Sequence, residues 1–319
     1  MSYRIGLGMA AFPFSTPRAF WRWVELCEDG DIDSLWQSDR LVSTQPQLET
    51  MATLAALAGG TERLKFGMNV LVLPFRDPLV VAKECASIDY LSGGRLLPAF
   101  GVGSDVVPEW RATGRSAPGR GAQSNEALQL IQRLWSEERV TFEGAHYRYT
   151  DVSIAPRPVQ QPLPCWIGGS SEAAIERTAR LGDGWLAGLQ TPAEVAPIVV
   201  AIKRAAQRAG RAIDPDHYGA GFAFRFGSWD EAVVERAAGQ RRVGRPSVDM
   251  RPHLAVGDSA VILRRLEEYR AAGISKFVLR PIGEGDDDIV DQTRRLIEEV
   301  VPAVHREWNA APEPSQAGR

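Results

Sequence analysis

The sequence predicts an α/β protein built as a single (β/α)8 TIM barrel. Short apolar runs alternate with amphipathic helical segments about eight times, which is the rhythm of a closed parallel barrel. A doubly wound open sheet is the competing architecture. Its GxGxxG fingerprint is missing, because Gly6 and Gly8 are followed by Met9, Ala10 and Ala11. With 319 residues, 44% of them hydrophobic, the chain can bury one large core. We expect one domain over residues 1–308 and a disordered tail at 309–319.

The first half of the chain supplies four β-α units. Thr16 can cap a helix that has Pro17 in its first turn, and Asp77 with Pro78 opens another. The expected strands are 4–10, 34–38, 64–71 and 95–102, and the expected helices are 17–29, 48–58, one starting at 77–78, and 122–136. After the fourth unit, residues 140–149 predict a two-stranded excursion, the first of two expected insertions.

The second half repeats the alternation. The expected strands are 164–168, 184–188, 217–226 and 275–280, and the expected helices are 171–181, 193–209, 230–238, 259–272 and 287–305. The polar, arginine-rich stretch Gly239 to Val256 follows the seventh unit. We interpret it as a second insertion, a lid that closes over bound ligands, although an ordinary surface loop is the alternative.

Composition excludes several classes of function. A net charge of −3 gives no extended positive field for nucleic acid, and no apolar run approaches the roughly 20 residues that span a bilayer. No signal peptide is evident, so we expect a cytoplasmic protein. Cys27, Cys85 and Cys165 are interpreted as buried small hydrophobes. The histidines, which are His146, His217, His253 and His305, lack metal-ligand spacing, so we expect no metal.

Four stretches resemble the luciferase-like monooxygenase superfamily, which includes FMN-dependent monooxygenases and deazaflavin-dependent dehydrogenases. The stretches are Leu35-Trp36-Gln37-Ser38-Asp39-Arg40, Lys65 to Pro74, Leu91 to Gly103, and Trp166-Ile167-Gly168-Gly169-Ser170-Ser171-Glu172 with Ala179 to Trp185. The resemblance covers nearly all of residues 1–305 and implies a flavin at the carboxyl ends of the barrel strands.

Gly168, Gly169, Ser170 and Ser171 are predicted to form a phosphate cradle. Glycines after a strand let the backbone approach a ligand, and the N-terminus of the next helix favours an anion. The alternative is that the serines only cap this helix and the glycines only make the turn.

The resemblance places a non-prolyl cis peptide between Asn69 and Val70, behind the flavin ring. An ordinary buried strand is the alternative. Gly101, Gly103 and Ser104 end the fourth strand beside this position. They are expected to admit the flavin edge, unless they merely form a tight turn.

Asp39 and Arg40 end the second strand on the catalytic face and are the catalytic candidates, with a surface ion pair as the alternative. Alcohol-oxidising deazaflavin relatives tend to have histidine where this chain has Arg40, and arginine cannot serve as a general base. The segment from Asp105 to Trp110 also departs from the family pattern.

Arg225 and Arg280 end the seventh and eighth strands, where either could bind an anionic substrate or form a structural salt bridge. His253, in the expected lid, is interpreted as a surface residue.

The resemblance implies that reduced FMN and dioxygen oxygenate a small organic substrate. A deazaflavin-dependent reductase or dehydrogenase is the first alternative, and a non-catalytic flavin-binding barrel is the second. A flavin reductase would supply reduced flavin, and the chain is expected to form a homodimer. No motif identifies the substrate, because the pocket is shaped by loops.

Overall fold

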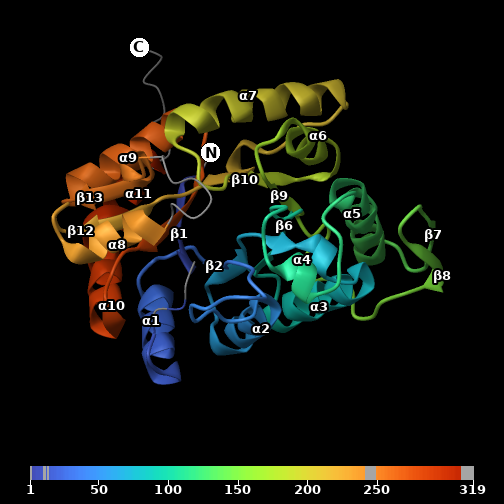
Figure 1. Ribbon diagram of the computed structural model, residues 1–319, viewed down its shortest axis with the longest axis horizontal. Helices are drawn as coiled ribbons and strands as arrows, with labels where there is room; N and C mark the ends of the chain where they lie inside the picture. Colours follow the sequence, from blue (N-terminus) through green and yellow to red (C-terminus); the bar gives the residue numbers. More distant parts are fainter. Residues whose placement is uncertain (1, 10–11, 13, 241–248, 310–319) are drawn as a thin grey trace, which may run out of the picture.

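The computed structural model describes residues 2–9, 12, 14–240 and 249–309, and its main sheet is parallel and curled (Figure 1). The strands of this sheet are β1 (Arg4–Met9), β2 (Ser34–Gln37), β3 (Lys65–Met68), β4 (Leu71–Val72), β5 (Leu96–Leu97), β6 (Ala99–Gly101), β9 (Trp166–Gly168), β10 (Gly184–Leu186), β11 (Tyr218–Ala220), β12 (Ala223–Phe226), β13 (Leu254–Gly257) and β14 (Lys276–Pro281). β1 pairs with both β2 and β14, and the pairings continue through β3 and β5 on one side and β11, β10, β9 and β6 on the other. This arrangement agrees with the predicted α/β class and its curled parallel sheet.

The helices cover the outside of the sheet (Figure 1). All of them lie where a helix was predicted except the short one at 109–112, and the helix expected at 287–305 is divided in two. They are α1 (Pro17–Asp29), α2 (Thr50–Gly60), α3 (Pro78–Ser92), α4 (Glu109–Ala112), α5 (Arg120–Ser136), α6 (Glu172–Leu181), α7 (Pro192–Arg208), α8 (Ala232–Gln240), α9 (Ser259–Ala271), α10 (Gly285–Arg295) and α11 (Val301–Trp308). Thr16 and Asp77 cap α1 and α3 through their side chains, as predicted. No helix among the described residues is both long and apolar enough to cross a membrane.

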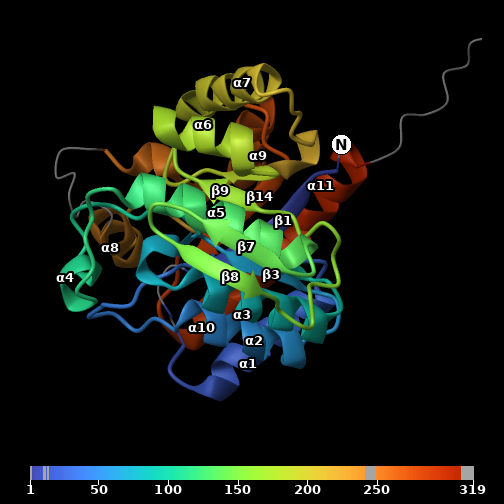
Figure 2. The same cartoon turned by 90° about the vertical axis from the view of Figure 1, so that its right-hand side faces the viewer.

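The hairpin of β7 (Val140–Glu143) and β8 (Arg148–Val152) lies between α5 and β9 in the chain, at the edge of the molecule (Figures 1 and 2). It matches the excursion expected at 140–149. Glu126 on α5 accepts hydrogen bonds from the backbone N–H groups of Ala145 and His146, which ties the hairpin turn to the helix.

Local chemistry interrupts several of the predicted elements. The strand expected at 95–102 is split at Pro98, which has no N–H to donate to the sheet. The strand expected at 217–226 divides into β11 and β12 around Gly221, where a Cβ atom would lie 1.8 Å from the carbonyl oxygen of Val278. The helix expected at 287–305 contains a π-helical turn over Leu296–Val300, because Pro302 cannot donate to the carbonyl of Glu298.

The predicted extent of the lid, Gly239 to Val256, is wrong at both ends. Gly239 and Gln240 belong to α8. Residues 254–257 form β13, which pairs in parallel with β12, and Leu254, Ala255 and Val256 are buried. The strand was not predicted, because its apolar run is short and stands next to polar residues. Residues 241–248 of the expected lid and residues 310–319 of the expected tail lie outside the described residues.

The three cysteines are buried and free, as expected of small hydrophobes. Burial raises the pKa of each thiol above its usual value, so none is a ready thiolate nucleophile.

Candidate functional site

A cavity of about 910 Å³ lies over the carboxyl ends of the strands, and a smaller one of about 150 Å³ adjoins it. The two cavities share Leu189, which follows β10, and Arg280, near the end of β14. Other lining residues lie at or just after the carboxyl ends of β1, β2, β3, β6 and β11: Gly8, Met9, Ser38, Asn69, Ser104 and Gly221. The cavities are therefore at the end of the sheet where parallel barrels hold their active sites.

Asn69 lines the smaller cavity, and its peptide bond to Val70 is cis, as the resemblance implied. Val70 packs between two other predicted site residues. A Cβ atom would lie 2.6 Å from Val70 Cγ2 if added at Gly101, and 2.8 Å from Val70 Cγ1 if added at Gly168. The structure thus brings Asn69, Val70, Gly101 and Gly168 together. The two glycines make room for the Val70 side chain, a contact that we had not predicted.

Gly103 fits the alternative of a tight turn. Its φ is +69°, and a Cβ atom there would lie 2.9 Å from Val72 Cγ1. The next residue, Ser104, lines the larger cavity, and its carbonyl accepts a hydrogen bond of 2.8 Å from the indole of Trp110.

The predicted phosphate cradle stands at the junction of β9 and α6. Gly169 has a φ of +109°, and its carbonyl accepts a 2.7 Å hydrogen bond from Trp185 Nε1. Ser171 caps α6 by accepting from Ala174 N at 3.3 Å, so the capping alternative holds for this residue. The N–H groups of the first turn of a helix have no intrahelical acceptor, so a phosphate could also bind there.

Gln190 is a feature of this region that we had not predicted. Its Nε2 donates to Ser170 Oγ at 3.1 Å, while its buried Oε1 has no hydrogen-bond partner among the described residues. A buried, unpaired acceptor beside a helix N-terminus suits a ligand with hydroxyl groups close to its phosphate.

Asp39 lines neither cavity. Its carboxylate accepts hydrogen bonds of 2.6 and 2.8 Å from Arg76 and of 2.8 Å from the backbone N–H of Val72. Only 2% of the Asp39 side chain is exposed. Burial alone would lower the pKa of Arg76, but the hydrogen bonds from its guanidinium to Asp39 and Glu49 raise that pKa. This geometry favours a carboxylate that positions the chain after Val70, not one that touches substrate.

Arg40 does line the larger cavity, and its guanidinium lies 3.5 Å from Glu109 in an ion pair. Glu109 is buried at the start of α4, and its Oε2 has no hydrogen-bond partner within the described part of the chain. Sequence reasoning missed Glu109, because it stands in the segment that departs from the family pattern.

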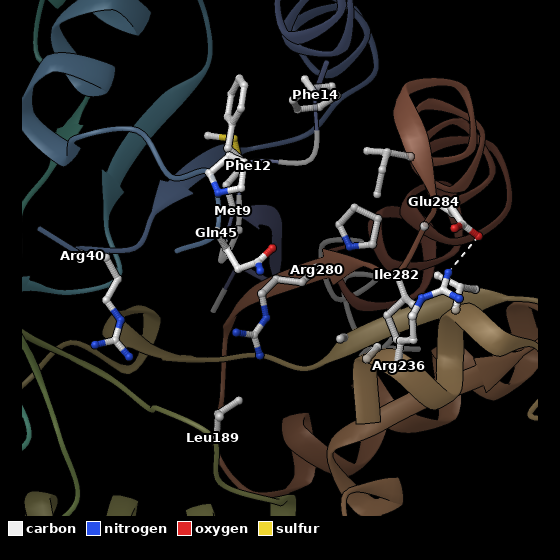
Figure 3. Close-up of a pocket in the computed structure, with 18 of the residues that line it drawn as sticks. Met9, Phe12, Phe14, Arg40, Gln45, Leu189, Arg236, Arg280, Ile282 and Glu284 are labelled. Atoms are coloured by element: carbon white, nitrogen blue, oxygen red, sulfur yellow. Dashed lines mark ion pairs between the residues drawn. The ribbon is translucent and has the colours of Figure 1, made fainter. Parts of the chain in front are cut away.

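The two arginines expected to bind substrate lie in different surroundings. Arg225 is almost buried, with Glu231 at 2.7 Å and Asp288 at 2.9 Å, so its geometry favours the structural ion pair. Arg280 extends between Arg40, Leu189 and Ile282 into the larger cavity (Figure 3). His253 lies in the 3-10 turn before β13 and lines neither cavity.

A curled parallel sheet with a cavity over the carboxyl ends of its strands is the architecture of TIM-barrel proteins. The luciferase-like monooxygenase family matches residues 4–285, and the chain belongs to this family.

Curated relatives match about half of the chain. A protein of Mycobacterium tuberculosis described as uncharacterized is 34% identical over 168 residues, which are 52% of this chain and 57% of that protein. An F420-dependent glucose-6-phosphate dehydrogenase of Amycolatopsis mediterranei is 31% identical over 192 residues, 57% of this chain and 56% of the relative. The chain thus spans a little over half the length of these two relatives.

Solved structures share the fold over nearly the whole chain. The monooxygenase RslO1 from Streptomyces bottropensis has a TM-score of 0.80 and 21% identity, covering 94% of this chain and 99% of that one. An F420-dependent secondary alcohol dehydrogenase has a TM-score of 0.82 and 20% identity, covering 95% and 99%. At these identities the likeness shows the fold.

Proposed function

We propose that this chain is an oxidoreductase that uses reduced FMN and dioxygen to oxygenate a small organic substrate. One observation carries the proposal. Asn69 and Val70, with Gly101 and Gly168 packed against Val70, stand at the strand ends beside a cavity, where the family resemblance places the flavin ring. A monooxygenase is among the solved structures with this fold.

The residues present fit such a cofactor. Its phosphate would lie at the N-terminus of α6, with Gly169 in a conformation that glycine favours and Gln190 Oε1 available to a hydroxyl group. When bound, reduced flavin would supply the electrons that activate dioxygen. The chain would position the ring, keep water out of the cavity and orient the substrate through Arg280. Asp39 would hold the shape of the site through its buried ion pair with Arg76. Arg40 would not act as a general base, because an arginine stays protonated.

A deazaflavin-dependent reductase or dehydrogenase is the second candidate. The partial matches to F420-dependent glucose-6-phosphate dehydrogenases, at 31% to 35% identity, favour it. The same cavity and helix N-terminus would serve a deazaflavin, and the chemistry would be hydride transfer without dioxygen.

Cofactor binding and turnover together test these candidates. We expect the purified protein to bind reduced FMN in a fluorescence titration and to consume dioxygen with substrate present. Binding of a deazaflavin coenzyme with no binding of FMN would refute the first candidate and favour the second. Tight flavin binding without turnover on any substrate would indicate a non-catalytic flavin-binding barrel.

We further propose that residues 1–308 form a complete (β/α)8 barrel with insertions after its fourth and seventh units. The protein would work in the cytoplasm, where a flavin reductase would supply its reduced flavin. A homodimer is also proposed. Sedimentation of the purified chain at twice the monomer mass would support the dimer, and a monomer would refute it.

A further inference from the structure

Six of the apolar side chains that line the larger cavity form what we call the aromatic wall. Two of its residues follow β1, and the others lie at the end of β1, in α1, between β14 and α10, and in α10. Its members are Met9, Phe12, Phe14, Trp23, Ile282 and Ile289. Figure 3 labels four of them: Met9, Phe12, Phe14 and Ile282. In the sheet, β2 separates β1 from β3, and β11 and β10 separate β14 from β9. The cofactor is proposed to lie at β3 and β9.

The aromatic wall offers a ligand no side-chain hydrogen-bond partner. The single polar atom among its side chains is the indole N–H of Trp23, which donates to Thr293 Oγ1 at 2.8 Å in a buried contact. The backbone N–H of Phe12 is also occupied, since it donates to the carbonyl of Pro46 at 2.8 Å. A hydroxyl group buried against this wall without a partner would cost roughly 1–3 kcal/mol.

The wall is held in place from both ends. The ring of Phe14 lies 5.5 Å from that of Trp23 and 5.4 Å from that of Phe12, between centroids. Ser15 N donates to Asp286 at 2.8 Å, which ties the segment after β1 to the start of α10. An apolar surface that is already ordered can bind an apolar ligand without first paying for its own ordering.

We propose that the substrate carries a flat apolar body of aromatic or fused-ring size that packs on the aromatic wall, and that polyhydroxylated sugars are poor ligands. This proposal deepens the proposed function and rests on it, because the bound molecule is a substrate only if the chain is an enzyme. A cavity of about 910 Å³ is near the top of the usual range for ligand sites, so it has room for such a body. The polar group of the substrate would face Arg280, at the boundary of the two cavities.

Calorimetric titration of the full chain, with any co-purified cofactor retained, tests this inference. The probes are 2-naphthol, a fused-ring aromatic with one hydroxyl, and glucose 6-phosphate. We expect 2-naphthol to bind with a dissociation constant on the order of 0.1 mM and at least about 100-fold more tightly than the sugar. Equal or tighter binding of glucose 6-phosphate would overturn the inference.

Two variants tie the binding to the aromatic wall. Phe14→Ala should weaken 2-naphthol binding about tenfold, and so should Phe12→Ala, whose half-buried ring is the safer one to remove for folding. Phe142→Ala is the matched control, because Phe142 is another half-buried phenylalanine but lies in β7, outside both cavities. If Phe12→Ala melts like the wild type and binds 2-naphthol equally well, the wall is not the binding surface.

Cofactor titrations run in parallel separate the two proposals. Binding of 2-naphthol that depends on Phe12, with no binding of FMN or deazaflavin, would leave the inference standing and refute the proposed function. Cofactor binding without binding of 2-naphthol would refute the inference and leave the proposed function standing.

Discussion

Replacing Asp39 by asparagine distinguishes a positioning carboxylate from a catalytic one. The substitution keeps the shape of the side chain but removes the charge that faces Arg76 in two hydrogen bonds of 2.6 and 2.8 Å. It also weakens the acceptor that holds the backbone N–H of Val72, two residues after Val70. Arg76 would keep a single carboxylate partner, Glu49, at 2.9 Å.

The expected loss of stability follows from the burial of the Asp39–Arg76 ion pair. The side chains of Asp39 and Arg76 are 2% and 12% exposed, and removing one partner of a buried ion pair costs about 3–5 kcal/mol. Glu49 remains and compensates part of the charge, although it is 44% exposed. We therefore expect Asp39→Asn to lower the free energy of unfolding by about 2–3 kcal/mol and to weaken cofactor binding.

Urea unfolding of Asp39→Asn, Arg76→Met and the double variant measures the coupling directly. We expect a coupling energy of about 1–3 kcal/mol between the two side chains. Asp151→Asn is the control, because Asp151 pairs with Arg139 on the surface, where such pairs contribute about 0–1 kcal/mol. If Asp39→Asn kept wild-type stability and cofactor affinity but lost turnover, Asp39 would be catalytic and the structural reasoning would be wrong.

Three further substitutions test separate parts of the molecule. Gly168→Ala puts a Cβ atom 2.8 Å from Val70 Cγ1 and should weaken cofactor binding about tenfold in a fluorescence titration; unchanged affinity would mean that Val70 yields freely. For Asp33, burial favours a raised pKa, but the charge of Lys276 lowers it to about 2. Because this folded-state pKa lies below the unfolded value of about 3.9, the carboxylate stabilises the fold at neutral pH by about 2 kcal/mol and loses that contribution as pH falls from about 4 to about 2. Urea unfolding should therefore show the deficit of Asp33→Asn shrinking over this window, and a constant deficit would contradict the assignment. Arg225→Met should cost about 2–4 kcal/mol of stability and leave KM unchanged, whereas a raised KM with normal stability would restore its role in substrate binding.

Features that depend on neighbouring residues could be predicted from the sequence. Thr16 and Asp77 cap helices because a side-chain oxygen reaches an N–H group two or three residues away, and that geometry is written into the local sequence. Strand β13 escaped because its apolar run, Leu254 to Val256, is short and its partner β12 lies about 30 residues earlier, so no local periodicity indicated it.

The candidate site also combines features that the sequence predicted with features that it did not. Asn69, Val70, Gly101 and Gly168 could be selected through the family resemblance, but the reason for the glycines needed the position of the Val70 side chain. The partner of Arg225, Asp288, stands 63 positions away in the chain, and only the curvature of the sheet brings the two together. Phe12, Phe14 and Gln190 belong to loops without a motif, so their shared surroundings could not be predicted from local patterns.

The side chains that line the two cavities indicate how the chemistry is divided between chain and cofactor. Among the described residues lining them there is no histidine, cysteine, lysine or tyrosine, and the cations are Arg40, Arg236 and Arg280. Arg236 forms an ion pair with Glu284 at 2.8 Å, and Glu284 is the single acid in these walls, with 73% of its side chain exposed (Figure 3). An arginine does not exchange a proton near neutral pH, and an exposed carboxylate is a weak base. The lining residues can therefore bind and orient a substrate and exclude water, and the proposed function assigns the bond-changing steps to a bound cofactor.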